Sequence, residues 1–309
     1  MKPSASNGKG NLRLIIGCME NDNSQSDLQS LRSTISGSAW HRLSTLLEFS
    51  CTKPEWIFLE IKDGALAGAL ALVAPSKFNV PVEIVRLHGE PEGGTSALPL
   101  FQRAIKKAGL CGTRELYCTI SENSADAAII SEAQFRPWRK IVRFESAGPI
   151  NRAVQPYRSV EVNLFTRAEI IALIENTSEH SRDSQINYYR RRLGTMADAN
   201  LTLQMMESTN YDPSWWRVAL DAGGNTLGII FPVVAFAVLT VGFIGVIPEC
   251  RGRNIASFLL AEAWTFIKQQ GHVTLSAEAD ERSVAMHRAL TKSQFNPRSQ
   301  KQEWRLELP

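Results

Sequence analysis

Hydrophobic positions along the chain form short runs that occur in the same order twice, once in each half. Each half begins with two runs of residues that are either apolar or alternate between apolar and polar, and a turn joins them. A third such run follows. This pattern is typical of three strands. Each half then continues with a helical pattern, a strand, a second helix and a terminal strand. The strands predicted before the terminal ones are 56–61, 66–73, 82–87 and 115–120 in the first half, and 215–220, 227–235, 239–247 and 273–279 in the second.

An offset of 160 residues relates the two halves residue by residue. Trp56 matches Trp216, and Gln134-Phe135 matches Gln294-Phe295. Further matches at this offset are Gly64 with Gly224, Gly68 with Gly228, and Pro137 with Pro297. Several matches at one offset indicate an internal duplication. The sequence therefore predicts an α/β (mixed α+β) protein of two tandem domains, each a mixed, mostly antiparallel sheet flanked by helices.

The boundaries of these domains follow from residues that interrupt regular structure. Residues 1–11 are polar and rich in glycine and serine, which predicts a disordered tail. Gly148, Pro149 and Pro156 separate a first domain at 12–150 from a second at 158–309. The second domain is expected to begin with helices near 167–175 and 183–193.

Composition restricts the class of protein without identifying it. The 309 residues exceed what one hydrophobic core usually serves, and 44% hydrophobic with 21% charged residues is typical of globular chains. The formal charge of +3 arises from 34 basic and 31 acidic residues, which does not indicate a nucleic-acid partner. The longest apolar stretch, 227–246, contains Pro232 and is better interpreted as two strands than as a membrane span.

Cysteine usage suggests the compartment. The five cysteines show no C-x-x-C spacing, and no signal peptide precedes the first domain, so we expect a cytoplasmic protein. No spacing typical of metal ligands occurs anywhere, and no metal cofactor is expected.

The segment 241–256 carries the clearest chemical signal. A predicted strand runs into a loop containing Gly252, and a helix with one apolar face follows. Such a loop directs unpaired backbone N–H groups and the positive end of a helix to one point, which suits a pyrophosphate. Arg251 and Arg253 add positive charge. A loop that simply enters a core helix is the alternative interpretation.

This segment resembles motif A of the GNAT superfamily of N-acetyltransferases, in which a strand ending in Val-x-Pro precedes a Gln/Arg-x-x-Gly-x-Gly/Ala loop. Val246, Pro248, Arg251 and Ala256 match it in spacing. The resemblance implies that the strand backbone at Ile244, Gly245 and Val246 pairs with the arm of acetyl-CoA, and that an amide there polarises the thioester carbonyl. The loop amides implied to hold the pyrophosphate are those of Gly252, Arg253, Asn254, Ile255, Ala256 and Ser257.

Asn254 stands where the family usually has glycine. Asparagine tolerates a positive φ better than most residues, so we expect the loop conformation to be retained.

The stretch 279–295 is similar to motif B of the same family. Ser283 stands where an asparagine often contacts the CoA arm, and Gln294 replaces the usual glycine before Phe295. Leu290 occupies the place of the tyrosine that protonates the leaving thiolate in many members, so that acid is absent. In the first half the likeness is architectural, with Asn123 spaced before Phe135 as Ser283 is before Phe295.

The loop at 90–97 in the first half carries Glu90 and Glu92 and no arginine. Carboxylates there would repel a pyrophosphate. We therefore expect a degenerate first domain and one acetyl-CoA per chain, bound in the second half.

Transfer of an acetyl group to an amine needs a base, because the attacking nitrogen must lose a proton. Alternation along 273–280 places Ser276, Glu278 and Asp280 on one face of a strand. Glu278 is the first candidate and Asp280 the second, with a salt-bridged carboxylate at the strand end as the alternative. For His287, packing within a helix is the preferred interpretation.

Two functions remain open from the sequence alone. The first is transfer of an acetyl group, or a longer acyl group, from CoA to a primary amine of a small molecule or peptide. The second is a non-catalytic acyl-CoA-binding or scaffold protein. Tyr188, Tyr189 and Arg190–Arg192 either line an acceptor cleft or belong to a partly buried amphipathic helix, with the arginine run on its solvated face. The acceptor and the oligomeric state have no signal in the sequence.

Overall fold

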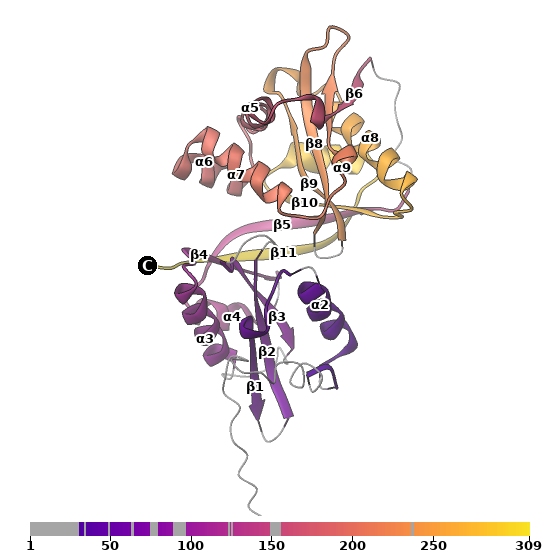
Figure 1. Ribbon diagram of the computed structural model, residues 1–309. Helices are drawn as coiled ribbons and strands as arrows, with labels where there is room; N and C mark the ends of the chain where they lie inside the picture. Colours follow the sequence, from indigo (N-terminus) through magenta and orange to yellow (C-terminus); the bar gives the residue numbers. More distant parts are fainter. Residues whose placement is uncertain are drawn as a thin grey trace, which may run out of the picture.

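The computed structural model describes residues 31–33, 35–48, 50–62, 65–74, 80–88, 97–122, 124, 126–148, 156–235 and 238–309. Two halves of similar architecture lie one above the other, joined by two long strands that cross between them (Figure 1). The predicted tail at 1–11, the loop at 90–96 and Asn123 lie outside the described residues.

The first half places helices on both faces of its strands (Figure 1). Its described elements are α2 (Gly37–Glu48), β1 (Ile57–Lys62), β2 (Ala65–Val73), β3 (Glu83–His88), α3 (Ala97–Leu110), β4 (Glu115–Ser121), α4 (Asp126–Glu132) and β5 (Arg136–Ser146). A short 3₁₀ turn at Pro54–Trp56 leads into β1, so the strand begins one residue later than predicted.

The second half repeats this order with additional helices at its beginning. Its elements are β6 (Arg158–Glu161), α5 (Arg167–Thr177), α6 (Ser184–Leu193), α7 (Thr195–Glu207), β7 (Arg217–Leu220), β8 (Thr226–Ala235), β9 (Val238–Val246), α8 (Ile255–Gln269), β10 (Leu275–Asp280), α9 (Val284–Lys292) and β11 (Asn296–Glu307). Helix α5 starts at a capping box in which Thr166 accepts from the Glu169 amide, and the Glu169 carboxylate accepts from the Thr166 amide.

All described strands join one sheet of eleven strands, in the order β1-β2-β3-β4-β11-β5-β10-β9-β8-β7-β6. The terminal strand of each half therefore lies in the sheet of the other half. β5 pairs with β10, β11 pairs with β4, and the two exchanged strands pair with each other in the middle. Only the β3–β4 and β9–β10 pairs are parallel, so the sheet is mostly antiparallel, as predicted.

The hydrophobic cores record the same exchange. Phe144 of β5 belongs to the core of the second half, together with residues such as Phe231 and Leu259. Trp304 of β11 belongs to the core formed by α3, α4 and the first-half strands. A third cluster packs α2 against the other face of the first-half sheet. Each half thus completes its interior with an aromatic side chain from the other.

The internal duplication is visible in backbone geometry. Gln134 and Gln294 have φ of 71° and 63°, and each precedes a buried phenylalanine, Phe135 and Phe295. The amides of these phenylalanines donate to the carbonyls of Ile130 and Leu290 at 3.1 and 3.0 Å. The left-handed residue therefore closes the last helix of each half, α4 and α9, in the same way.

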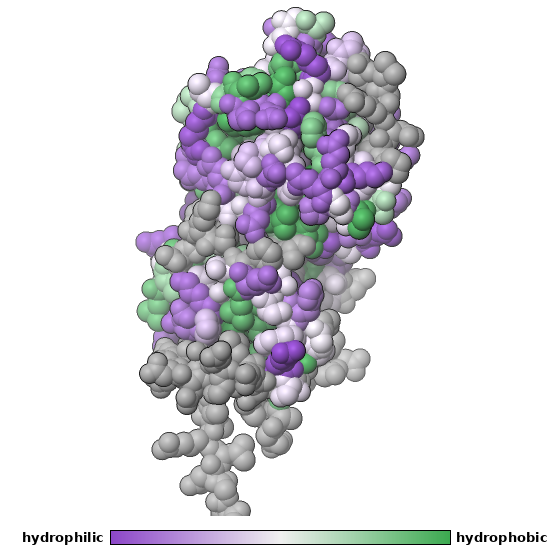
Figure 2. All heavy atoms as spheres, turned by 45° about the vertical axis from the view of Figure 1, so that its right-hand side comes forward, coloured by the Kyte–Doolittle hydropathy of each residue, from purple (hydrophilic) through white to green (hydrophobic). Residues whose placement is uncertain are grey.

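None of the helices in the described part of the chain has the length and hydrophobicity needed to cross a bilayer. Large hydrophobic side chains that remain exposed, such as Leu110, Leu164 and Met196, are far apart in sequence. On the face drawn in Figure 2, hydrophobic groups form small areas among polar ones. The domain limits at 12–150 and 158–309 stay a prediction. Because β5 and β11 are exchanged, a boundary between residues 150 and 158 would leave each half without a strand of its own sheet.

Candidate functional site

Strands β9 and β10 run side by side for a short distance and then separate. Their pairing is limited to Ser276 with Thr240 and Ala277 with Val241. At the point of separation β9 has a bulge, because Phe231 of β8 faces Phe243 while Pro232 faces Val241, which leaves Gly242 as the extra residue. The separation exposes one backbone edge of β9.

Backbone groups on this edge can be assigned from the ladder. The amide of Ile247 donates to the Leu227 carbonyl at 2.9 Å, so residue 247 faces β8. Residues facing one neighbour alternate along an antiparallel strand, and Gly245 therefore also faces β8. Ile244 and Val246 then direct their amides into the opening between β9 and β10. The Val246 carbonyl on that side accepts from Arg251 Nε at 3.1 Å.

The loop between β9 and α8 has the predicted left-handed geometry. Gly252 has a φ of 79°, and Asn254, the residue before α8, has a φ of 62°. The expectation that Asn254 tolerates a positive φ is confirmed. Helix α8 makes its first helical bond from Phe258 to the Asn254 carbonyl. Among the described residues no side chain caps this helix, which leaves the amides of 255–257 available.

The guanidinium of Arg251, expected to add positive charge for a pyrophosphate, is bonded to backbone carbonyls. Its Nη2 donates to the carbonyls of Thr177 at 3.0 Å and Glu179 at 2.5 Å, at the end of α5. Burial lowers the pKa of this guanidinium. Arg251 therefore fastens the loop to α5 while keeping its charge beside the loop.

A cavity of about 450 Å³ lies in the opening between β9, the loop, α8 and α9. Ten of the eleven residues predicted to contact acetyl-CoA line it: Ile244, Gly245, Val246, Arg251, Gly252, Asn254, Ile255, Ala256, Ser257 and Ser283. Arg253 does not, and its carbonyl accepts from Tyr157 Oη at 3.1 Å. The described lining includes Arg182, Arg251, Arg288 and Lys292 and no carboxylate.

Glycine at 245 is required by packing. A Cβ there would lie 2.4 Å from Thr177 Oγ1 and 2.5 Å from Thr177 Cβ, closer than any real contact. β9 can approach α5 closely only without a side chain at this position. At Gly252 a Cβ meets nothing within 4 Å, so that side of the loop is open.

Two residues of the stretch 279–295 take part in packing. Leu290, for which the resemblance implied a tyrosine, is 1% exposed and belongs to the core of the second half. His287 stacks edge-on against Phe144 at 5.2 Å, and its Nε2 lies 3.0 Å from the Asp280 carbonyl oxygen. The interpretation of His287 as a packing residue agrees with this position.

A second, larger cavity of about 950 Å³ lies between the two halves. It adjoins the first, because Ile186 and Phe243 line both. The face predicted from alternation along β10, formed by Ser276, Glu278 and Asp280, lines it. The opposite wall comes from the first half, including Glu83 of β3 and Arg42 of α2. Carboxylates are numerous in the described lining: Glu83, Asp183, Asp198, Glu278, Asp280 and Glu303.

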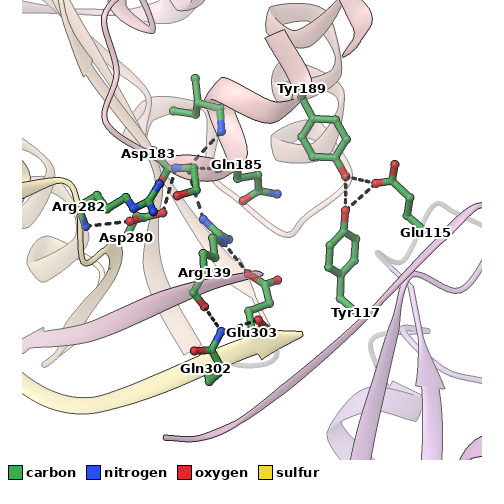
Figure 3. A network of polar contacts seen from close by, with 12 residues as sticks. Glu115, Tyr117, Arg139, Asp183, Gln185, Tyr189, Asp280, Arg282, Gln302 and Glu303 are labelled. Carbon is green, nitrogen blue, oxygen red and sulfur yellow. Dashed lines mark hydrogen bonds and ion pairs between the residues drawn. The ribbon is translucent and has the colours of Figure 1, made fainter. Parts of the chain in front are cut away.

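The two candidate bases, Asp280 and Glu278, differ in exposure and in the number of their hydrogen-bond and ion-pair partners. Asp280 is 1% exposed, and its carboxylate accepts from the backbone amides of Ser184 at 2.9 Å and Arg282 at 2.8 Å (Figure 3). Glu278 has one ion pair, with Lys301 at 3.3 Å, and its side chain is 45% exposed. Asp280 therefore fixes the beginning of α6, whereas the described contacts of the Glu278 carboxylate are limited to its ion pair with Lys301.

Sequence reasoning gave no role to Arg139, which connects the halves within the cavity. Its Nε donates to Glu303 of β11 at 2.5 Å, and its Nη1 lies 3.4 Å from Asp183 before α6 (Figure 3). Burial and its neighbour Arg139 act in opposite directions on Glu303, and the net effect is a raised pKa. Only the fold brings these three residues together, since they lie far apart in sequence.

Helix α6 of the second half docks on the first half through tyrosines. The hydroxyls of Tyr117 and Tyr189 lie 2.6 Å apart, and both bond to the Glu115 carboxylate (Figure 3). Tyr188 and Arg192 bond to the same carboxylate. Tyr188 and Tyr189 are half-buried, which agrees with the interpretation of a partly buried amphipathic helix. Tyr189 also lines the larger cavity, and a role for it in an acceptor cleft stays a prediction.

Glu83 is the carboxylate that the first half contributes to the described lining of the larger cavity. Among the described residues its side chain has no hydrogen bond or ion pair. Burial, reinforced by the nearby charge of Glu303, raises its pKa to about 7, while Arg42 and Lys301 act to lower it. Folding therefore favours the protonated form of Glu83.

The Glu83→Gln variant should test this electrostatic assignment by melting temperature. A raised pKa in the folded state means that the contribution of Glu83 to stability is complete below its ordinary pKa and is lost as the pH rises through about 7. At pH 8 the variant should have a higher melting temperature than the parent, equivalent to about 1 to 3 kcal/mol in the free energy of unfolding. At pH 4.5 the two melting temperatures should be nearly equal. The exposed control Glu48→Gln should show no such pH dependence, and a pH-independent gain in Glu83→Gln would contradict the assignment.

Comparison with solved structures decides the fold. A GCN5-related N-acetyltransferase from Sphaerobacter thermophilus matches with a TM-score of 0.56 at 17% identity, over 89% of this chain and 94% of that chain. A tandem GNAT protein from the clavulanic acid biosynthesis pathway matches with a TM-score of 0.53 at 14% identity, over 94% and 96%. The chain has the GNAT fold.

A GCN5-related N-acetyltransferase from Kribbella flavida shares this GNAT fold, with a TM-score of 0.54 at 13% identity over 86% of this chain and 93% of that chain. No protein-family model and no curated protein matches the sequence. The similarity to these proteins therefore lies in the fold and not in the sequence. Many different sequences can form the same arrangement of strands, bulge and loop before a helix.

Proposed function

We propose that this GNAT-fold chain is an N-acetyltransferase that moves an acetyl group from acetyl-CoA to a primary amine of a small molecule or peptide. The observation that carries the proposal is the junction, at the bulge of β9, of two cavities whose linings differ in charge. The smaller is lined by four basic residues and no described carboxylate, whereas the larger has six carboxylates and four basic residues, Arg42, Arg139, Arg143 and Lys301. An anionic donor and a cationic acceptor would meet at Phe243.

The smaller cavity fits acetyl-CoA in this proposal. The uncapped amides of 255–257 and the open side of Gly252 suit a pyrophosphate, and Arg288 and Lys292 supply charge at its rim. The amides of Ile244 and Val246 offer a strand edge to an amide-bearing arm. Acetyl-CoA would supply an activated acyl group, with its thioester carbonyl beside the bulge. The described residues contain no group of three His, Cys, Asp or Glu side chains able to hold a metal ion.

The reaction proposed is direct transfer. The ammonium of the acceptor gives one proton to Glu278, and the neutral nitrogen then forms a bond to the acetyl carbon. The carbon–sulfur bond breaks with its electron pair leaving on sulfur, and the nitrogen loses its second proton to solvent. A backbone amide of β9 at the bulge would stabilise the charge on the carbonyl oxygen. Leu290 is buried in the core and carries no acid, so solvent is proposed to protonate the thiolate.

The first half is proposed to bind no acetyl-CoA. Arg86 of β3 and Asp126, the first residue of α4, form an ion pair where β3 and β4 separate. In the second half the corresponding place between β9 and α9 is the smaller cavity. The same proposal includes a cytoplasmic location and an acceptor that is neither nucleic acid nor membrane.

A non-catalytic acyl-CoA-binding protein is the second candidate, and the burial of Leu290 in place of an acid favours it. Release of free CoA thiol in the presence of a library of amines separates the two. A binding protein would release none above the blank.

The Gly252→Asp variant tests the donor site. The new carboxylate would project into the open side of the loop, where the pyrophosphate is proposed to lie. We expect the affinity for acetyl-CoA to fall at least about tenfold, or about 1.4 kcal/mol, by calorimetry.

Gly271→Asp is a matched control, because Gly271 also has a positive φ, 86°, and an open Cβ position, but lies at the far end of α8. The control shows the effect of the strain alone. Equal acetyl-CoA affinity in the parent and Gly252→Asp would remove the loop from the proposed site.

A further inference from the structure

One face of α7 lines the larger cavity along most of the length of the helix. The residues on it are spaced at i, i+3, i+4, i+7 and i+8: Asp198, Leu201, Thr202, Met205 and Met206. Met206 marks the end beside the bulge, since a Cβ on Gly242 would lie 2.5 Å from its Sδ. Asp198 marks the other end. A rise of 1.5 Å per residue separates these two levels of the helix by about 12 Å.

Asp198 is an unusual carboxylate for this position. The residue is 5% exposed, and among the described residues its side chain has no hydrogen bond or ion pair. Arg190, whose charge acts to lower the pKa of Asp198, donates from its Nη1 to the Glu175 carbonyl at 3.0 Å. A buried carboxylate without a partner is expensive, because burial removes its hydration. Burial accordingly raises the pKa of Asp198 to about 6.

Between its two ends α7 contributes two apolar side chains to the cavity. Leu201 and Met205 lie on the same helical face as Asp198. Ile141 of β5 and Val85 of β3 add apolar groups to the lining from the sheet. A ligand that satisfies this lining needs a cationic group at Asp198, an aliphatic segment along Leu201 and Met205, and a reactive group at the bulge.

We infer that the acceptor is a linear aliphatic diamine, or a molecule with such an arm. One amino group would lie at the bulge beside Glu278, and the distal ammonium would pair with Asp198. This inference rests on the proposed acetyl transfer and specifies its substrate class. The ammonium supplies the partner that Asp198 lacks, and the charge-assisted hydrogen bond forms in a place already shielded from water. A monoamine of the same length would leave Asp198 unpaired.

The experiment compares 1,6-diaminohexane with hexylamine by calorimetry and by thiol release with acetyl-CoA. The full-length protein should bind the diamine at least about tenfold more tightly, about 1.4 kcal/mol. Asp198→Asn keeps the size of the side chain and removes its charge. This variant should lose the preference for the diamine and keep its affinity for hexylamine. 1,3-Diaminopropane is too short to reach both ends and should be insensitive to the substitution.

Two further variants complete the test. Thr202→Lys places an ammonium one helical turn from Asp198, where it can pair with that carboxylate, and should abolish the diamine preference by a separate route. The exposed Glu132→Gln on α4 is the control and should change neither affinity. Equal binding of diamine and hexylamine by the parent, or an unchanged preference in Asp198→Asn, would overturn the inference. Loss of acetyl-CoA binding alone would instead contradict the proposed function, so the two failures are distinguishable.

Discussion

Replacing Glu278 by glutamine is expected to lower kcat by about 100-fold, since a positioned general base contributes roughly 10²–10⁴. Glu278 follows Ala277, the last residue of β10 that pairs with β9, and therefore lies where the strands separate. Glutamine keeps the shape of the side chain and cannot accept a proton. Acetyl-CoA affinity should stay nearly unchanged, because the smaller cavity does not include this residue.

Glu281→Gln is the matched control for this measurement. Glu281 is an exposed carboxylate three residues further along the chain, and it lines neither cavity. Steady-state rates of thiol release for both variants, at saturating acetyl-CoA, decide the assignment. Full turnover by Glu278→Gln would transfer the role of base to another cavity carboxylate or to water.

Replacing Trp304 by alanine should destabilise the protein by about 3 to 5 kcal/mol, the usual loss for a buried aromatic side chain. Trp304 belongs to the second half by sequence but packs in the core of the first half. Hydrogen exchange should therefore accelerate in β4 and α3, more than 150 residues away along the chain.

Trp264→Ala provides the comparison, because Trp264 of α8 is buried in the core of its own half. In that variant the faster exchange should appear around α8 and β7. If both variants accelerated exchange in the second half alone, the exchanged strands would not have the packing described here. The pattern of exchange, more than the loss of stability, distinguishes the two cores.

The sequence predicted much of the order of elements, and most residues that line the smaller cavity, because both depend on local pattern. A strand and a left-handed Asn254 before a helix follow from residues that are neighbours in the chain, whereas the bulge at Gly242 was not predicted. The alternation along β10 likewise placed Glu278 and Asp280 on one face, as found.

The exchange of β5 and β11 had no such signal. The two terminal strands occupy equivalent positions in the repeat, and either could complete the sheet of its own half with the same alternation. Which strand pairs with which depends on contacts such as Phe144 and Trp304, far away in sequence. The role of Asp198 was missed for a similar reason, since α7 was not predicted and its cavity is built by both halves.

The exchanged strands also restrict how the protein can move. Two domains joined by a single linker can rotate about it and close on a ligand. Here a rotation would have to break the pairing of β11 with β4, which extends from Lys301–Ser121 to Glu307–Glu115, and that of β5 with β10. The part of the cavity lined by these strands therefore keeps a nearly fixed shape, and a change in its width would come from the helices α6 and α7 that also line it. Changes in the rate of ligand entry should accordingly map to the contacts of these helices, and not to a hinge between the halves.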